Sequence, residues 1–187
     1  MKKSFVLFTL LSVHMLLSAQ QKTSLRSIHS IGLLNGSKGA GLSLQSILGA
    51  SLKNSFAGVG LGLDHYSFRS IPLFVDFRQE LGRKKQRLFV YGDGGYNFDW
   101  LTERQANQQR QMFSSINFKG GMYYDAGLGY LVRFDNSNAL VFSLGYCYKE
   151  LKDKVPFTNC SIGACGVRTD TYTYHMPRVL IKAGWRF

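Results

Sequence analysis

The stretch GMYYDAGLGYLVRF, residues 121–134, alternates two kinds of side chain along its length. Mostly large apolar or aromatic residues occupy the even positions from Met122 to Phe134. Small or charged residues stand at four of the odd positions, namely Asp125, Gly127, Gly129 and Arg133. Because successive side chains of a β-strand point to opposite faces, the stretch predicts a strand with one apolar face and one small, charged face.

The same alternation recurs along the chain. In residues 71–80, four apolar residues share one face, and Asp76, Arg78 and Glu80 share the other. Eight such segments are expected, near residues 24–34, 39–52, 55–66, 71–82, 87–100, 121–134, 139–152 and 173–187. The predicted fold class is all-β, an eight-stranded antiparallel transmembrane β-barrel in up-and-down meander order.

A water-soluble barrel or sandwich would show the same alternation. The residues on the face with small and charged side chains therefore distinguish a soluble β-protein from a membrane barrel. Glycines and charges share that face, which suits the narrow interior of a small barrel. A soluble ligand-binding barrel would need a continuous apolar lining. Aromatic residues near the strand ends are typical of the two membrane interfaces, namely Tyr96, Phe98, Trp100, Tyr123, Tyr124, Tyr172, Tyr174 and Trp185.

The N-terminus has the pattern of a cleaved export signal. Lys2 and Lys3 precede an apolar run that ends at Leu17, and small residues stand before Gln20. The run is shorter than the roughly 20 residues of a membrane helix. We expect a signal peptide over 1–19 and a single barrel domain over 20–187. Cleavage would remove two of the 23 basic residues and none of the 11 acidic ones, so the mature formal charge is about +10.

Connector lengths carry a second signal. The links at 52–55, 83–86 and 135–138 are short, whereas those at 65–70, 101–120 and 153–171 are longer. Outer-membrane barrels have short periplasmic turns and long outer loops, so the pattern predicts that both termini face the periplasm. The first outer loop, 35–38, departs from the pattern because it is short.

Four stretches, GLSLQ (41–45), GLGLD (60–64), RSIPLF (69–74) and the terminal WRF (185–187), resemble a known family. This family comprises the small outer-membrane β-barrel proteins of Bacteroidetes-type bacteria. It belongs to the outer membrane protein A/X-like superfamily. The resemblance spans most of the mature chain and implies the fold and a place in the cell outer membrane, but no reaction. It also implies that Trp185 and Phe187 form the C-terminal signal read by the barrel-assembly machinery. That machinery and periplasmic chaperones are therefore expected partners during biogenesis.

If the faces are assigned correctly, eleven charged residues point into the barrel: Arg26, Asp64, Asp76, Arg78, Glu80, Asp93, Asp99, Asp125, Arg133, Lys182 and Arg186. Buried charges are costly unless they pair, so a structural ion-pair network that fills the lumen is the favoured interpretation. The alternative is a narrow ion channel or proton path.

For the protein as a whole, the first alternative function is a lipid A-modifying enzyme, and the narrow channel is the second. His65 and Ser67 stand two residues apart, so on a strand their side chains would share a face. The arrangement faintly resembles the His-x-Ser element of outer-membrane lipid A deacylases. No carboxylate that would orient the histidine is evident, and a polar loop entrance is the favoured interpretation.

Other chemistry is weakly indicated. Cys160 and Cys165 lie close together in a polar segment and are expected to form a disulfide after export, whereas Cys147 is expected to be a small buried thiol. The histidines lack metal-ligand spacing, so neither metal nor cofactor is expected, and signatures of nucleic-acid binding are absent. The positive charge favours anionic lipid headgroups and lipopolysaccharide as partners. The sequence thus predicts a monomeric barrel with a structural or surface-interaction role through its outer loops.

Overall fold

The computed structural model describes residues 23–82, 86–100, 117–135, 137–161 and 164–187. The predicted signal peptide at 1–19 and most of the predicted loop at 101–120 lie outside the described residues. Within the described part of the chain, no helix is long and apolar enough to cross a membrane.

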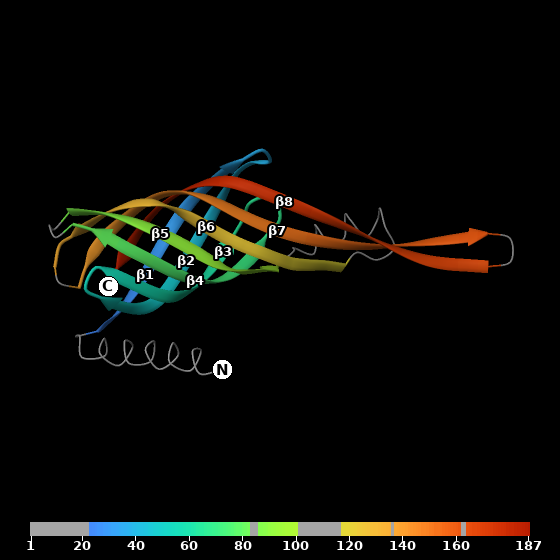
Figure 1. Ribbon diagram of the computed structural model, residues 1–187. Helices are drawn as coiled ribbons and strands as arrows, with labels where there is room; N and C mark the ends of the chain where they lie inside the picture. Colours follow the sequence, from blue (N-terminus) through green and yellow to red (C-terminus); the bar gives the residue numbers. More distant parts are fainter. Residues whose placement is uncertain (1–22, 83–85, 101–116, 136, 162–163) are drawn as a thin grey trace, which may run out of the picture.

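Eight antiparallel strands form a closed barrel, with each strand paired to its neighbours in sequence (Figure 1). The strands are β1 (Ser24–Gly36), β2 (Gly39–Leu52), β3 (Ser55–Asp64), β4 (Ser70–Leu81), β5 (Gln86–Asp99), β6 (Asn117–Arg133), β7 (Ala139–Ser161) and β8 (Ala164–Arg186). The predicted fold class is confirmed. For β1 to β5, the predicted bounds agree with the observed ones within about two residues.

The barrel closes where β1 pairs with β8, in a register that runs from Ile28↔Arg186 to Gly36↔Arg178. The strands are inclined to the barrel axis (Figure 1). The C-terminus lies at the same end as the short β2–β3 and β6–β7 connectors, 53–54 and 134–138. The other end holds the β1–β2 turn, the β3–β4 connector and the far parts of β7 and β8.

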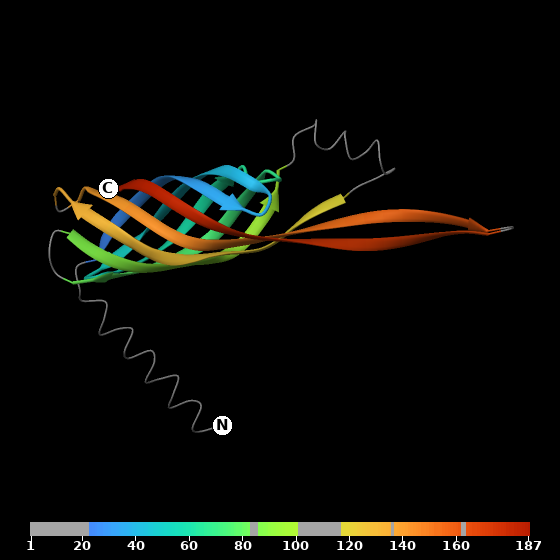
Figure 2. The same ribbon diagram turned by 90° about the horizontal axis from the view of Figure 1, so that it is seen from above.

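The long β7–β8 hairpin differs from the prediction. A loop was expected over 153–171, but the ladder continues to Ser161↔Ala164, and the hairpin projects well past the barrel (Figure 2). The segment is rich in strand-forming residues, among them Val155, Thr158 and Val167. Along this segment the sequence lacks the apolar–polar alternation that marks a half-buried strand, which is why a loop was predicted.

Every strand presents large apolar side chains on the outside of the barrel. Leu48 is 65 % exposed and Leu128 is 64 % exposed. Further outward residues are Leu33, Leu42, Val59, Leu61, Val75, Phe77, Leu88, Phe142, Leu144, Val179 and Ile181. Such a broad apolar surface is rare on a soluble monomer.

The interior holds apolar side chains as well as charges. One apolar cluster includes Ile47, Phe74 and Leu180, and a smaller one includes Phe89 and Val141. At Gly129, a methyl group would collide with the Phe89 ring, so the glycine makes room for this packing. Tyr123 was predicted at a membrane interface but is buried inside, because it shares the inward face of Asp125.

Candidate functional site

The first buried polar group, the Asp64 cluster, comprises Asp64, Lys149 and Arg178 near the hairpin end of the barrel. Arg178 Nη1 donates to Asp64 Oδ2 at 2.5 Å, and Lys149 Nζ lies 3.2 Å from Oδ1. The Tyr66 backbone N–H donates to the same Oδ1 at 2.9 Å. These charged side chains are at most 3 % exposed, so each charge depends on protein partners and not on water.

Lys149 also fastens the β3–β4 connector across the end of the barrel. Its ammonium has three further acceptors: the carbonyl oxygens of Tyr66 at 2.9 Å and Phe68 at 2.7 Å, and Ser70 Oγ at 3.1 Å. The Arg178 guanidinium lies over the Tyr66 ring, 5.2 Å from its centroid. Together these contacts hold Tyr66 inside the barrel, where its side chain is 1 % exposed.

The second group, the Asp125 cluster, lies in the middle of the lumen. Lys182 Nζ donates to Asp125 Oδ2 at 2.6 Å, and the Tyr91 hydroxyl donates to Oδ1 at 2.9 Å. Lys182 also donates to Gln45 Oε1 at 3.3 Å, and Gln45 Nε2 donates to the Tyr123 hydroxyl at 3.0 Å. The cluster therefore joins β2, β5, β6 and β8 through the interior.

Three carboxylates are neighbours in one cross-strand row of the lumen, because Asp76, Asp93 and Asp125 are partners on β4, β5 and β6. Arg78 compensates Asp76, with Nε 3.0 Å from each carboxylate oxygen. Lys182 Nζ lies 3.7 Å from Asp93 Oδ2, too far for a hydrogen bond. Within the described part of the molecule, neither Asp93 oxygen has a hydrogen-bond partner. Asp93 is therefore the least compensated of the three.

The third group, the Glu80 cluster, lies toward the end that holds the C-terminus. Three arginines surround one carboxylate, at 2.6 Å for Arg186, 2.7 Å for Arg87 and 2.9 Å for Arg133. Arg87 also donates to Asn54 Oδ1 in the β2–β3 turn at 3.2 Å. Positive charge is in excess here, and Arg133 keeps partial contact with solvent.

These side chains leave little free space at this level. An enclosed cavity among Arg78, Glu80, Phe89 and Arg186 has a volume of about 10 Å³. A site needs at least about 10–15 Å³ to hold one water molecule. Paired side chains therefore fill the lumen beside the Glu80 cluster.

The structure places eight of the eleven predicted lumen charges in buried positions: Asp64, Asp76, Arg78, Glu80, Asp93, Asp125, Lys182 and Arg186. Arg133 is partly buried in the Glu80 cluster. The prediction is wrong for Asp99, which is exposed at the last residue of β5. Arg26 is half-buried near the start of β1 and donates to the Ser137 carbonyl at 3.0 Å. Alternation assigns a side chain to a face but does not give its depth along the barrel.

Three lumen cations were absent from the predicted set: Arg87, Lys149 and Arg178. For Arg178 the signal was present, because it precedes Lys182 and Arg186 at intervals of four and so shares their face. Lys149 likewise shares the face of Cys147, which is buried as predicted.

The candidate base His65 and the candidate nucleophile Ser67, which belong to the enzyme alternative, are both exposed in the β3–β4 connector. Ser67 has a φ of 58°, so the segment is a turn and not the continuous strand from which a shared face was inferred. A different histidine and serine lie together: His29 and Ser46 are cross-strand partners on β1 and β2. Ser46 Oγ lies 3.0 Å from His29 Nδ1.

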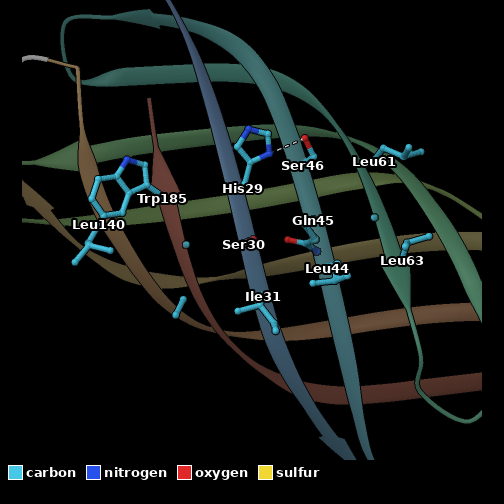
Figure 3. Close-up of a pocket in the computed structure, with 13 residues that line it drawn as sticks. His29, Ser30, Ile31, Leu44, Gln45, Ser46, Leu61, Leu63, Leu140 and Trp185 are labelled. Carbon is cyan, nitrogen blue, oxygen red and sulfur yellow. Dashed lines mark hydrogen bonds between the residues drawn. The ribbon is translucent and has the colours of Figure 1, made fainter.

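His29 and Ser46 lie in a groove of about 690 Å³ on the outside of the barrel, here called the outward groove. Figure 3 shows the imidazole and the hydroxyl pointing toward each other, with Trp185 and Leu140 on one side and Leu61 and Leu63 on the other. The remaining outward-facing lining residues are Ile31, Leu44 and Ala183. Polar groups are thus concentrated at one point of an apolar surface.

The C-terminal aromatic residues lie next to this groove. Trp185 stacks on Phe134, with ring centroids 5.6 Å apart and an interplanar angle of 21°. The Phe187 ring meets the His29 ring edge-on at 6.0 Å. Both aromatic side chains face outward, and their role as an assembly signal stays a prediction.

The backbone places Cys160 directly opposite Cys165 near the tip of the hairpin. Their side chains lie outside the described part of the structure, so the disulfide stays a prediction. Among the described residues, no group of three or more histidine, cysteine, aspartate or glutamate side chains could hold a metal ion.

No family model and no curated protein matches this sequence. Solved structures do resemble it in fold. Neisserial surface protein A (NspA) has a TM-score of 0.57 at 10 % identity, covering 89 % of this chain and 98 % of its own. The outer membrane protein AlkL, solved in lipid bilayers, has a TM-score of 0.51 at 11 % identity, with 90 % of each chain covered. The chain therefore has the eight-stranded barrel fold found in these outer-membrane proteins.

Proposed function

We propose that this protein is an integral barrel of the cell outer membrane with a closed interior and a structural or surface-interaction role. The observation that carries the proposal is the inversion of polarity, with apolar side chains on the outside of every strand and ion pairs inside. A soluble protein of this size would expose a much smaller apolar patch. The fold shared with NspA and AlkL supports the same location.

In this proposal, both termini and the short turns face the periplasm, and the β7–β8 hairpin extends outside the cell. The hairpin is then the surface feature best placed to meet lipopolysaccharide or another partner. The signal peptide, the barrel-assembly machinery and the periplasmic chaperones belong to the route by which the chain would reach the membrane. The monomeric state and the relationship to Bacteroidetes-type barrels rest on the sequence alone.

The closed interior favours the structural role over the channel alternative. The lumen charges pair across the barrel in three clusters, and the enclosed cavity beside Glu80 has the volume of about one water molecule. Ions would have to break these pairs in order to pass.

An arginine scan of the outer face tests the proposal. Leu128 lies about midway along the barrel part of β6, whereas Leu25 lies next to the first residue of β1. In a bilayer, arginine costs about 2–4 kcal/mol near the midplane and about 0–1 kcal/mol near an interface. We expect L128R to weaken folding into vesicles strongly and L25R to weaken it little.

The readout is heat-modifiable migration on gels, in which a folded barrel runs as a compact form before boiling. A soluble barrel would tolerate both arginines, because both positions are already exposed to solvent. Equal folding of L128R and L25R, or absence of the wild type from outer-membrane fractions, would therefore overturn the proposal.

A further inference from the structure

We propose that the mouth of the barrel at the C-terminal end binds one phosphate group, held by the arginines of the Glu80 cluster. The site itself depends on the observed fold. Only the side from which the anion arrives, the periplasm, rests on the proposed membrane location. The Glu80 cluster would then be a ligand site as well as an ion-pair network.

The arginines lie at the very end of the lumen. Arg133 and Arg186 are the last residues of β6 and β8, and Arg87 is the second residue of β5. Arg26 lies two residues before Ile28, the cross-strand partner of Arg186, so it faces the same mouth. The Arg133 side chain is 25 % exposed, so solution reaches the cluster from this end.

Positive charge at this mouth exceeds what the carboxylate compensates. Three guanidinium groups share Glu80, so three positive charges and one negative charge leave +2 among these four side chains. Among the described carboxylates, only Glu80 lies within ion-pair distance of Arg133 or Arg186. A dianionic phosphate would balance this excess charge, whereas a bound water molecule would leave it unchanged.

Several N–H groups of these arginines still lack an acceptor. Arg186 bonds to Glu80 through Nη1, and Arg133 bonds to it through Nη2. Within the described part of the molecule, the buried Nε atom of each arginine has no hydrogen-bond partner. On Arg186, Nε and Nη2 form the side of the guanidinium that matches two oxygens of a phosphate. Buried donors without acceptors are costly, so an oxyanion at this place would stabilise the barrel.

The position inside the lumen favours a soluble phosphate over a lipid headgroup. Leu25 and Phe187, the neighbours of Arg26 and Arg186 in sequence, point to the outside of the barrel. The wall therefore separates the guanidinium groups from surrounding lipid. Deeper in the lumen, the enclosed cavity beside Glu80 measures only about 10 Å³, so the anion would stop at the mouth. Inorganic phosphate or a phosphate monoester in the aqueous periplasm can reach this place directly.

Isothermal titration calorimetry of the full-length folded protein in a non-ionic, phosphate-free detergent tests the site. The titrant is inorganic phosphate, and potassium chloride of the same ionic strength is the reference. Screening of charge alone would act equally in both salts. A second titration uses monomeric short-chain phosphatidylglycerol, which carries the phosphate of a lipid headgroup.

We expect one saturable phosphate site per barrel and no saturable binding of chloride or phosphatidylglycerol. R133Q should weaken phosphate binding about tenfold or more, because it removes a charge and its donors from the site. R133K should lie between R133Q and the parent, since lysine keeps the charge but lacks the planar fork. K53Q removes the same charge from an exposed residue of the β2–β3 turn and should bind phosphate like the parent.

A compact, heat-modifiable parent without saturable phosphate binding would overturn the inference and leave the proposed barrel intact. Equal weakening by R133Q and K53Q would also overturn it, because net charge alone would then explain the effect. Phosphatidylglycerol binding as tight as phosphate binding would assign the arginines to lipid headgroups and likewise overturn it. Saturable phosphate binding by a protein absent from outer-membrane fractions would support the site and overturn only the membrane location. The parent titrations need no variant to fold.

Discussion

At the scale of single residues, the buried carboxylates of the lumen differ in how closely cations and hydrogen-bond donors surround them. Asp64 has two cations and a backbone N–H within hydrogen-bonding distance. Asp93 has one cation at 3.7 Å and no hydrogen bond. Two buried aspartates of the same barrel should therefore differ in how much stability they lose on replacement by asparagine.

Replacing Asp64 with asparagine should destabilise the barrel by about 3–5 kcal/mol, because Lys149 and Arg178 would remain buried without a counter-charge. Unfolding by denaturant in detergent micelles measures the change. D170N is the matched control, since Asp170 pairs with Arg168 on the hairpin, where the arginine is 75 % exposed, and it should cost less than about 1 kcal/mol. Similar losses for both variants would contradict the buried Asp64 cluster.

Replacing Asp93 with asparagine should leave stability unchanged or raise it, because asparagine places no charge beside Asp76 and Asp125 and weakens only the 3.7 Å contact with Lys182. D125N should be destabilising, since Asp125 accepts from both Lys182 and Tyr91. The same unfolding assay compares them. A larger loss for D93N than for D125N would show that Asp93 has a partner of greater importance than the structure indicates.

At the scale of the elements, the β7–β8 hairpin stands apart from the other strands. Within the barrel its residues alternate between the outer face and the lumen. Beyond Lys154↔Thr171, the two strands pair with each other outside the barrel (Figure 2). An isolated two-stranded hairpin is marginally stable in water, so a covalent link near its tip would have a clear structural purpose.

We expect Cys160 and Cys165 to be bonded in exported protein, because the backbone register sets them opposite each other. Thiol alkylation followed by mass spectrometry should label no cysteine in folded, unreduced protein. Reduction should expose two thiols, and unfolding should expose Cys147 as the third. Labelling of Cys160 and Cys165 before reduction would exclude the bond, and C160S with C165S provides the control for Cys147.

At the scale of the whole molecule, closure of the barrel organises the charges. Glu80 on β4 meets Arg186 on β8, and Asp64 on β3 meets Arg178, although more than one hundred residues separate each pair. The same closure leaves the apolar side chains of every strand on the outside. One arrangement thus produces both the apolar outer surface and the ion pairs of the lumen.

The ion-paired lumen should not conduct. We expect purified monomer inserted into planar bilayers to give no discrete conductance steps, since ions would have to separate buried pairs. A porin added afterwards to the same membrane verifies that steps would be detected. Steady steps from monomer alone would favour the channel alternative and contradict the closed interior.

The sequence by itself determined the strands and their faces, because alternation is a local property that each segment carries independently. It therefore identified eight strands, most of the lumen charges and the apolar outer surface. Only the tertiary structure decided which charges meet, how deep each lies and that Lys149 reaches across to the β3–β4 connector. It also decided that His29, and not His65, lies beside a serine in a groove. These relations depend on strand register and barrel closure, which join residues far apart in the chain and leave no periodic signal in it.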